Sequence, residues 1–125
     1  MGEIRNYTCK CGYTKDIFRG VGFMAHSLTG LDNLFPEEVK LIRQEQEKGN
    51  EIYFFSDNIV TVCPKCKELR NVARLKYQLS DGVKRETFIE NCDSCGEKTI
   101  AVMSEAISCP RCGKPMEHRY AGNWD

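Results

Sequence analysis

The chain has 125 residues, 41% hydrophobic and 29% charged, and its 18 basic residues are balanced by 18 acidic ones. This is ordinary globular composition, which excludes a disordered chain. No apolar run approaches the roughly 18 residues that a membrane span requires, and the first residues lack the apolar stretch of a signal peptide. We therefore expect a single domain over residues 1–125, a cytoplasmic location and no membrane partner.

The chain begins with two β-like segments, residues 4–8 and 13–18, on either side of a first cysteine pair. A short Gly-Val-Gly-Phe segment follows at 20–23. No Gly-Lys-Ser/Thr follows these glycines, so the segment is not a phosphate-binding loop. We interpret it as a backbone turn or a place of close packing.

Residues 35–49 predict one inserted helix. Pro36 suits the first helical position and Gly49 suits the stop. Phe35, Val39 and Ile42 fall on one face at helical spacing. The second half of the helix is polar, so we expect the helix to dock by its first half.

The remaining elements are short and β-like. The aromatic run at 53–55 is expected to be core, and residues 58–62 form a β-rich segment before the second cysteine pair. Residues 69–77 alternate, with Asn71 the one exception on the apolar face. After a turn at 80–82 come β-like segments at 87–89, 98–103 and 106–108. We expect residues 119–125 to form a loose tail.

Eight cysteines form four close pairs, here called the first to fourth knuckles: Cys9 and Cys11, Cys63 and Cys66, Cys92 and Cys95, Cys109 and Cys112. Reduced thiols at this spacing indicate metal or redox chemistry, and disulfides are disfavoured in the cytosol. No strand–helix–strand pattern surrounds a knuckle, which disfavours a thioredoxin-type dithiol. Two knuckles can supply the four sulfurs of a tetrahedral zinc site, so the sequence predicts two Zn²⁺ ions per chain.

Four knuckles allow three pairings, and spacing alone leaves them open. The sequential pairing joins the first knuckle to the second and the third to the fourth. The nested pairing joins the second to the third and the first to the fourth. We prefer the nested one, because the spacer between the second and third knuckles contains two well-patterned strands. Its sites are then Cys9, Cys11, Cys109 and Cys112 (site 1), and Cys63, Cys66, Cys92 and Cys95 (site 2).

Residues 59–102 resemble a zinc ribbon of the rubredoxin-like superfamily, through their Cys-Pro-x-Cys and Cys-x-x-Cys-Gly knuckles. Residues 107–116 resemble the closing knuckle of a second ribbon. The whole chain is similar to small bacterial double zinc-ribbon proteins that carry a Cys-Gly-Tyr knuckle and a Gly-Val-Gly-Phe segment. The first knuckle departs from the pattern, with one residue between its cysteines. This resemblance implies a fold and a metal, and no activity.

The expected fold class is therefore small, metal-bound and β-rich (α+β), with two zinc-ribbon units of short antiparallel hairpins. The inner ribbon spans 58–103, the outer ribbon combines 1–19 with 104–120, and the helix at 35–49 is inserted between them. Rubredoxins use the same four-cysteine cage, so iron at a four-cysteine site is the alternative cofactor.

Catalytic motifs are missing from the sequence. A catalytic zinc keeps an open position, whereas eight cysteines would fill two sites. Neither His26 nor His118 lies in a His-Glu-x-x-His motif. We expect no catalytic residue, no enzyme activity and no small-molecule substrate.

The leading hypothesis is a non-enzymatic protein-interaction module with structural zinc and an unknown protein partner. The second is a nucleic-acid-associated factor with a basic stripe formed by Arg70, Arg74, Lys76 and Arg85. Eight thiolates and two divalent ions would leave a net charge of about −4, which favours phosphate binding only locally. The third is a rubredoxin-like iron electron carrier.

Overall fold

The computed structural model describes residues 2–21 and 26–124. Its elements, in chain order, are β1 (Gly2–Thr8), β2 (Thr14–Gly20), α1 (Leu31–Leu34), α2 (Pro36–Glu47), β3 (Tyr53–Cys63), β4 (Glu68–Gln78), β5 (Lys84–Phe88), β6 (Ile100–Val102) and β7 (Glu117–Trp124). The fold is a small, mostly antiparallel β-sheet with little helix, in keeping with the β-rich class that the sequence predicts.

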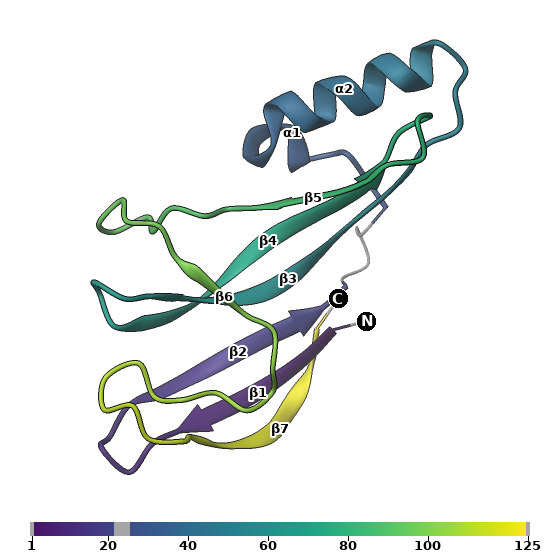
Figure 1. Cartoon of the computed structure of the whole chain (residues 1–125). Helices are drawn as coiled ribbons and strands as arrows, with labels where there is room; N and C mark the ends of the chain where they lie inside the picture. The colour runs from purple at the N-terminus through teal and green to yellow at the C-terminus, as the bar shows by residue number, and fades with distance from the viewer. Residues whose placement is uncertain (1, 22–25, 125) are drawn as a thin grey trace.

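The seven strands form one sheet with two halves. Its order is β5-β4-β3-β2-β1-β7, and β6 pairs with β3 off this path. We call β1, β2 and β7 the outer half and β3 to β6 the inner half. Among the described residues, strand pairing joins the halves at one position, Gly20 opposite Asn58. In Figure 1 the outer half lies below the inner half, and the helices lie at the top.

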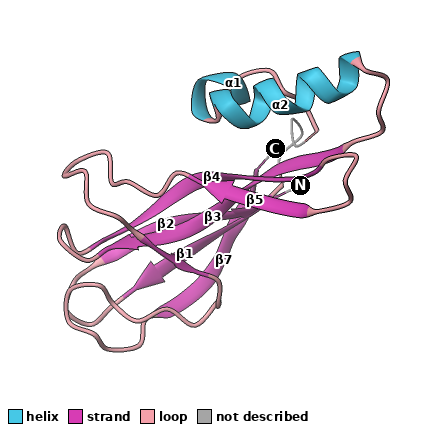
Figure 2. Ribbon diagram, turned by 45° about the horizontal axis from the view of Figure 1, so that its top comes forward, coloured by secondary structure: helices cyan, strands magenta, loops and turns pink. Residues whose placement is uncertain are grey.

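The helix α2 covers one face of the inner half (Figure 2). Pro36 stands in its first turn, and the chain leaves the helix through Gly49, which has a φ of 79°. Val39 and Ile42 are 1% and 0% exposed and pack with Leu75 of β4. Burying such apolar side chains is the main favourable term in folding, so the first half of the helix docks as predicted.

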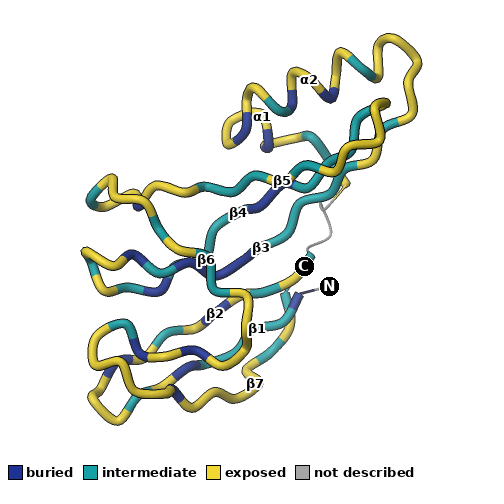
Figure 3. Tube along the Cα trace, viewed as in Figure 1, coloured by how far each residue is buried: buried dark blue, intermediate teal, exposed yellow. Residues whose placement is uncertain are grey.

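A second apolar cluster lies where the two halves meet. It includes Tyr7 and Ile17 from the outer half and Val60 and Leu69 from the inner half, all at most 1% exposed. Figure 3 shows these buried stretches on the strands, with exposed chain at the turns and along most of β7. The halves therefore share a core, although in residues 2–21 and 26–124 backbone pairing between them is limited to Gly20 and Asn58.

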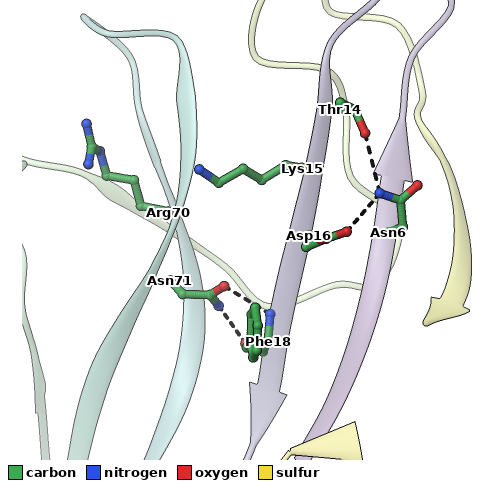
Figure 4. A pocket seen from close by; sticks show the side chains of 7 residues that line it. All are labelled: Asn6, Thr14, Lys15, Asp16, Phe18, Arg70 and Asn71. Atoms are coloured by element: carbon green, nitrogen blue, oxygen red, sulfur yellow. Dashed lines mark hydrogen bonds between the residues drawn. The ribbon is translucent and has the colours of Figure 1, made fainter. Parts of the chain in front are cut away.

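Asn71 provides a polar connection between the halves. Its side-chain oxygen accepts from the Phe18 amide at 2.9 Å, and its side-chain nitrogen donates to the Phe18 carbonyl at 2.5 Å. Phe18 pairs with Ile4 of β1 on one side, and on the side towards β4 the Asn71 amide takes the place of a second strand partner (Figure 4). Beside it lies a hollow of 690 Å³ between β2 and β4, with Lys15 and Arg70 on its two sides.

Three sequence-based expectations are corrected by the structure. Residues 117–124 are no loose tail, because β7 pairs with β1 from Thr8 opposite Glu117 to Gly2 opposite Trp124. The inner hairpin is not short, since β3 and β4 have 11 residues each. The run at 53–55 is not all core: Phe54 packs towards the helix, but Tyr53 is 63% exposed. Alternate residues of a strand point to opposite faces, which separates Tyr53 from Phe54.

Gly22 and Phe23, half of the Gly-Val-Gly-Phe segment, lie outside the described residues. Within the described ranges, no helix has the length and apolar character needed to cross a membrane.

Candidate metal centre

The structure gathers the eight cysteines into two groups of four. Cys9, Cys11, Cys109 and Cys112 form one group, and Cys63, Cys66, Cys92 and Cys95 form the other. We call them the outer cluster and the inner cluster. Within each group the sulfur atoms all lie within 4.8 Å of one another. This is the nested arrangement, and the turns that carry the cysteines lie at one end of the molecule, at the left in Figure 1.

Each knuckle is closed by the same backbone hydrogen bond. The residue after the second cysteine donates its amide to the carbonyl of the first cysteine, at 2.8 or 2.9 Å in all four knuckles. That residue has a positive φ each time, and it is glycine in three knuckles and Lys67 (φ 54°) in the second. In the first knuckle the bond runs from Gly12 to Cys9 and spans one residue fewer. The shorter spacing therefore still brings both sulfurs to one side.

The sulfur positions fit a tetrahedral metal ion. Zinc–sulfur bonds of about 2.3 Å place the sulfurs of a tetrahedral site about 3.8 Å apart. In the inner cluster, Cys63 and Cys95 are 3.5 Å apart and Cys66 and Cys92 are 3.9 Å apart. In the outer cluster, Cys9 and Cys112 are 3.3 Å apart and Cys11 and Cys109 are 3.6 Å apart. All eight cysteines are free thiols, so each cluster can hold one ion without a disulfide having to break.

One cysteine of each cluster has a lowered pKa, which favours its thiolate form. The backbone amides of Ser94 and Cys95 donate to Cys92 and lower its pKa to about 6. Burial opposes ionisation of Cys109, but amides of its own turn outweigh burial and lower its pKa to about 7. Cys92 and Cys109 are each the first cysteine of a Cys-x-x-Cys turn, and in both cases amides of that turn favour the thiolate.

The sulfurs of Cys9, Cys66 and Cys95 are harder to ionise while no cation is present, because the pKa of each is raised. Hydrogen bonding to Cys95 and desolvation raise the pKa of Cys66 to about 12. The Cys11 amide favours the Cys9 thiolate, but contact with the neighbouring sulfurs, Cys112 first, raises the pKa of Cys9 to about 12. Four thiolates at these distances repel one another. A divalent ion would remove that repulsion, so the clusters are built for a cation.

Tyr13, directly after the first knuckle, connects the outer cluster to the inner half. Its hydroxyl accepts from the Leu69 amide at 2.9 Å and donates to the Glu68 carboxylate at 3.1 Å. Arg111 of the fourth knuckle pairs with the same carboxylate, and its guanidinium lies 4.8 Å from the Tyr13 ring. Sequence reasoning missed Tyr13 and the linking role of Asn71. The signal for Asn71 was its polar side chain on an otherwise apolar strand face.

The four predicted nucleic-acid residues do not form one free basic stripe. Arg74 is buried, and its guanidinium bonds both carboxylate oxygens of Asp57 at 2.9 and 2.5 Å. Arg70 pairs with Asp93 at 2.5 Å and bonds the Ser94 hydroxyl. A buried, bidentate arginine is not available to a phosphate.

The other two predicted basic residues lie on opposite faces of the sheet. Lys76 stands opposite Phe55 in the β3–β4 ladder, and Arg85 stands opposite Tyr77 in the β4–β5 ladder. Because Lys76 and Tyr77 are neighbours in one strand, their side chains point to opposite sides. Arg85 is also paired with Asp81 at 2.6 Å.

Comparison of the chain with protein-family models, curated protein sequences and solved structures finds no match. The fold and the two clusters define a β-rich protein with two candidate metal sites of four cysteines each, and the likeness to zinc ribbons rests on those clusters.

Proposed function

We propose that each cluster binds one Zn²⁺ as a structural site and that the protein acts as a non-enzymatic interaction module. The observation that carries this proposal is that four cysteine sulfurs converge in each cluster. Four thiolates complete the tetrahedral coordination of zinc and leave no position for a substrate or a reactive water. Each ion would then contribute to folding rather than to chemistry.

The position of the outer cluster supports a structural role. Cys9 and Cys11 lie between β1 and β2, and Cys109 and Cys112 shortly precede β7. An ion held there joins segments that are about 100 residues apart, at the place where the sheet is completed by a strand from the other end of the chain. Closing so long a loop is entropically costly, and a metal bond offsets that cost.

Iron is the alternative metal, since thiolate cages of this geometry accept both ions. Iron would favour electron transfer over a structural role. An interaction module needs a macromolecular partner, either a protein or a nucleic acid. An electron carrier needs a metal that changes its oxidation state, so the partner and the metal together distinguish the two functions.

Cobalt substitution tests whether the sites are closed. The protein is loaded with two equivalents of Co²⁺, and its visible spectrum is recorded with and without excess imidazole and cyanide. A closed site of four cysteines gives a tetrahedral thiolate spectrum that added ligands leave unchanged. A spectrum that shifts on ligand addition reveals an open coordination position and contradicts the structural role.

A further inference from the structure

The face of the inner half that α2 does not cover carries a groove of 580 Å³ over β3, β4 and β5. The residues of interest in its lining are Tyr53, Phe55, Lys76, Lys84, Arg85 and Glu86. The strand register explains how five of them meet. Tyr53, Gln78 and Lys84 form one row across three strands, and Phe55, Lys76 and Glu86 form the next. Residues two apart in a strand share a face, so aromatic and basic side chains alternate on it.

The aromatic rings in the groove are accessible. Tyr53 is 63% exposed, the most exposed large hydrophobic side chain of the described chain. Its ring centroid lies 6.4 Å from that of Phe55, with the ring planes at 70°. Phe55 is half-buried, and the His26 ring also lies near it, with 6.4 Å between the ring centroids and the planes at 53°. The pair therefore offers one free ring and one anchored ring, at an angle that leaves the face of each ring unstacked by the other.

The charges in the groove favour an anion. Lys76 lies 5.9 Å from the Phe55 ring centroid, and the nearest oxygen of Glu86 lies 3.9 Å from its ammonium. Lys84 is exposed and forms no ion pair with the described residues. On the face that carries the two rings, the lining contains the cations Lys76 and Lys84 and the carboxylate Glu86. Arg85 belongs to the other face by its strand position and is paired with Asp81. Lys76 and Lys84 thus provide positive charge directly beside the exposed rings.

We propose that this groove binds single-stranded nucleic acid, with bases stacked on Tyr53 and Phe55 and phosphates held by Lys76 and Lys84. Exposed aromatic faces beside basic side chains on a sheet are what a single strand needs, because every base has a face that stacks. A duplex hides its base faces, so it would meet only the two lysines. The inference rests on the proposed interaction function and names its partner class.

Binding is measured by fluorescence anisotropy of labelled 12-nucleotide oligo(dT) and oligo(U) on the zinc-loaded full chain. At 50 mM salt we expect saturable binding of one or both single strands, and weaker binding of a 12-base-pair duplex. For two phosphate contacts, log Kd should rise with log salt with a slope of about 1.4. A stronger response to oligo(U) than to oligo(dT) would identify RNA as the source of the strand.

Matched variants assign the site. Tyr53→Ala should weaken binding roughly 5- to 150-fold, which corresponds to the loss of one stacked base. Tyr120→Ala is the control, since Tyr120 is a similarly exposed tyrosine on β7 in the outer half. Lys84→Glu should weaken binding and lower the salt slope, whereas Lys40→Glu on the exposed side of α2 should change neither.

Metal content and circular dichroism are recorded on every sample. These two measurements test the structural zinc sites separately from the nucleic-acid groove. No binding at 50 mM salt by a chain that holds two zinc ions overturns the nucleic-acid inference and leaves the structural sites standing. An equal loss of oligonucleotide binding in Tyr53→Ala and Tyr120→Ala also overturns the nucleic-acid inference. Displacement of the oligonucleotide by poly-glutamate at equal charge would show a general anion or acidic-protein surface, and overturns the stacking role.

Discussion

The two halves of the molecule are stabilised in different ways. In the inner half, α2 packs on β4 through side chains that are 0–1% exposed, so this half has an apolar core of its own. The outer half is a three-stranded sheet whose last strand, β7, is largely exposed. Its cluster is also the more open one, with Cys11 and Cys112 exposed, whereas no cysteine of the inner cluster is exposed. We infer that the outer half depends more on its metal.

Removing the outer metal site should have the largest effect. Cys109→Ser is expected to lower the metal content from two ions to one and to unfold β1, β2 and β7, because a structural zinc contributes on the order of 10 kcal/mol. Amide exchange and NMR should show loss of the Gly12 signal and of the β1–β7 ladder, while Gly96 and the helix keep theirs. Changes centred on Gly96 instead would contradict the nested grouping.

A cavity in the inner core should have the next largest effect. Ile42→Ala is expected to destabilise the chain by about 2–5 kcal/mol, since Ile42 is fully buried against the sheet. Leu41→Ala, at a neighbouring residue that is 45% exposed, is the control and should cost well under half as much. Urea unfolding measures both. A stability loss in Ile42→Ala accompanied by loss of the outer metal would show that the halves are not separable.

The link between the halves gives a smaller effect. Asn71→Ala removes two hydrogen bonds to the Phe18 backbone and should cost about 1–3 kcal/mol. Asn6→Ala, which removes exposed side-chain bonds to Thr14 and Asp16 within the outer half, should cost less. Faster amide exchange at Phe18 is the specific readout. If both variants lower the free energy of unfolding by the same amount, Asn71 is not a link between the halves.

Acid release of metal should distinguish the clusters by a small margin. A thiol whose pKa is lowered by folding stabilises the fold above its unfolded value of about 8.5, and that contribution is lost as the pH falls through the folded value. The pKa of Cys109 is about 7 and that of Cys92 about 6. Bound metal moves both transitions to lower pH, because protons compete with it. Two outer cysteines are exposed and no inner one is, so protons and a chromogenic chelator reach the outer cluster more easily. Outer release should therefore be detected at the higher pH, and release from the inner cluster first would contradict this difference.

The sequence predicts what local chemistry determines. Cysteine spacing indicated the knuckles, and the proline and glycine at the ends of 35–49 bounded the helix because they act on the backbone beside them. The sequence predicted that residues 1–19 and 104–120 meet, but not that β7 continues along β1 to Trp124, because such pairing depends on a register between distant residues. The pairing of Arg74 with Asp57 was also missed. That pair depends on the β3–β4 register, which brings the two residues directly opposite each other.

Elemental analysis with a visible absorption spectrum, on protein purified without added metal, tests the central claim most directly. The account predicts two zinc ions per chain and no visible bands. Iron with a reversible colour change on reduction, or a metal content of one ion per chain or less, would contradict two structural zinc sites.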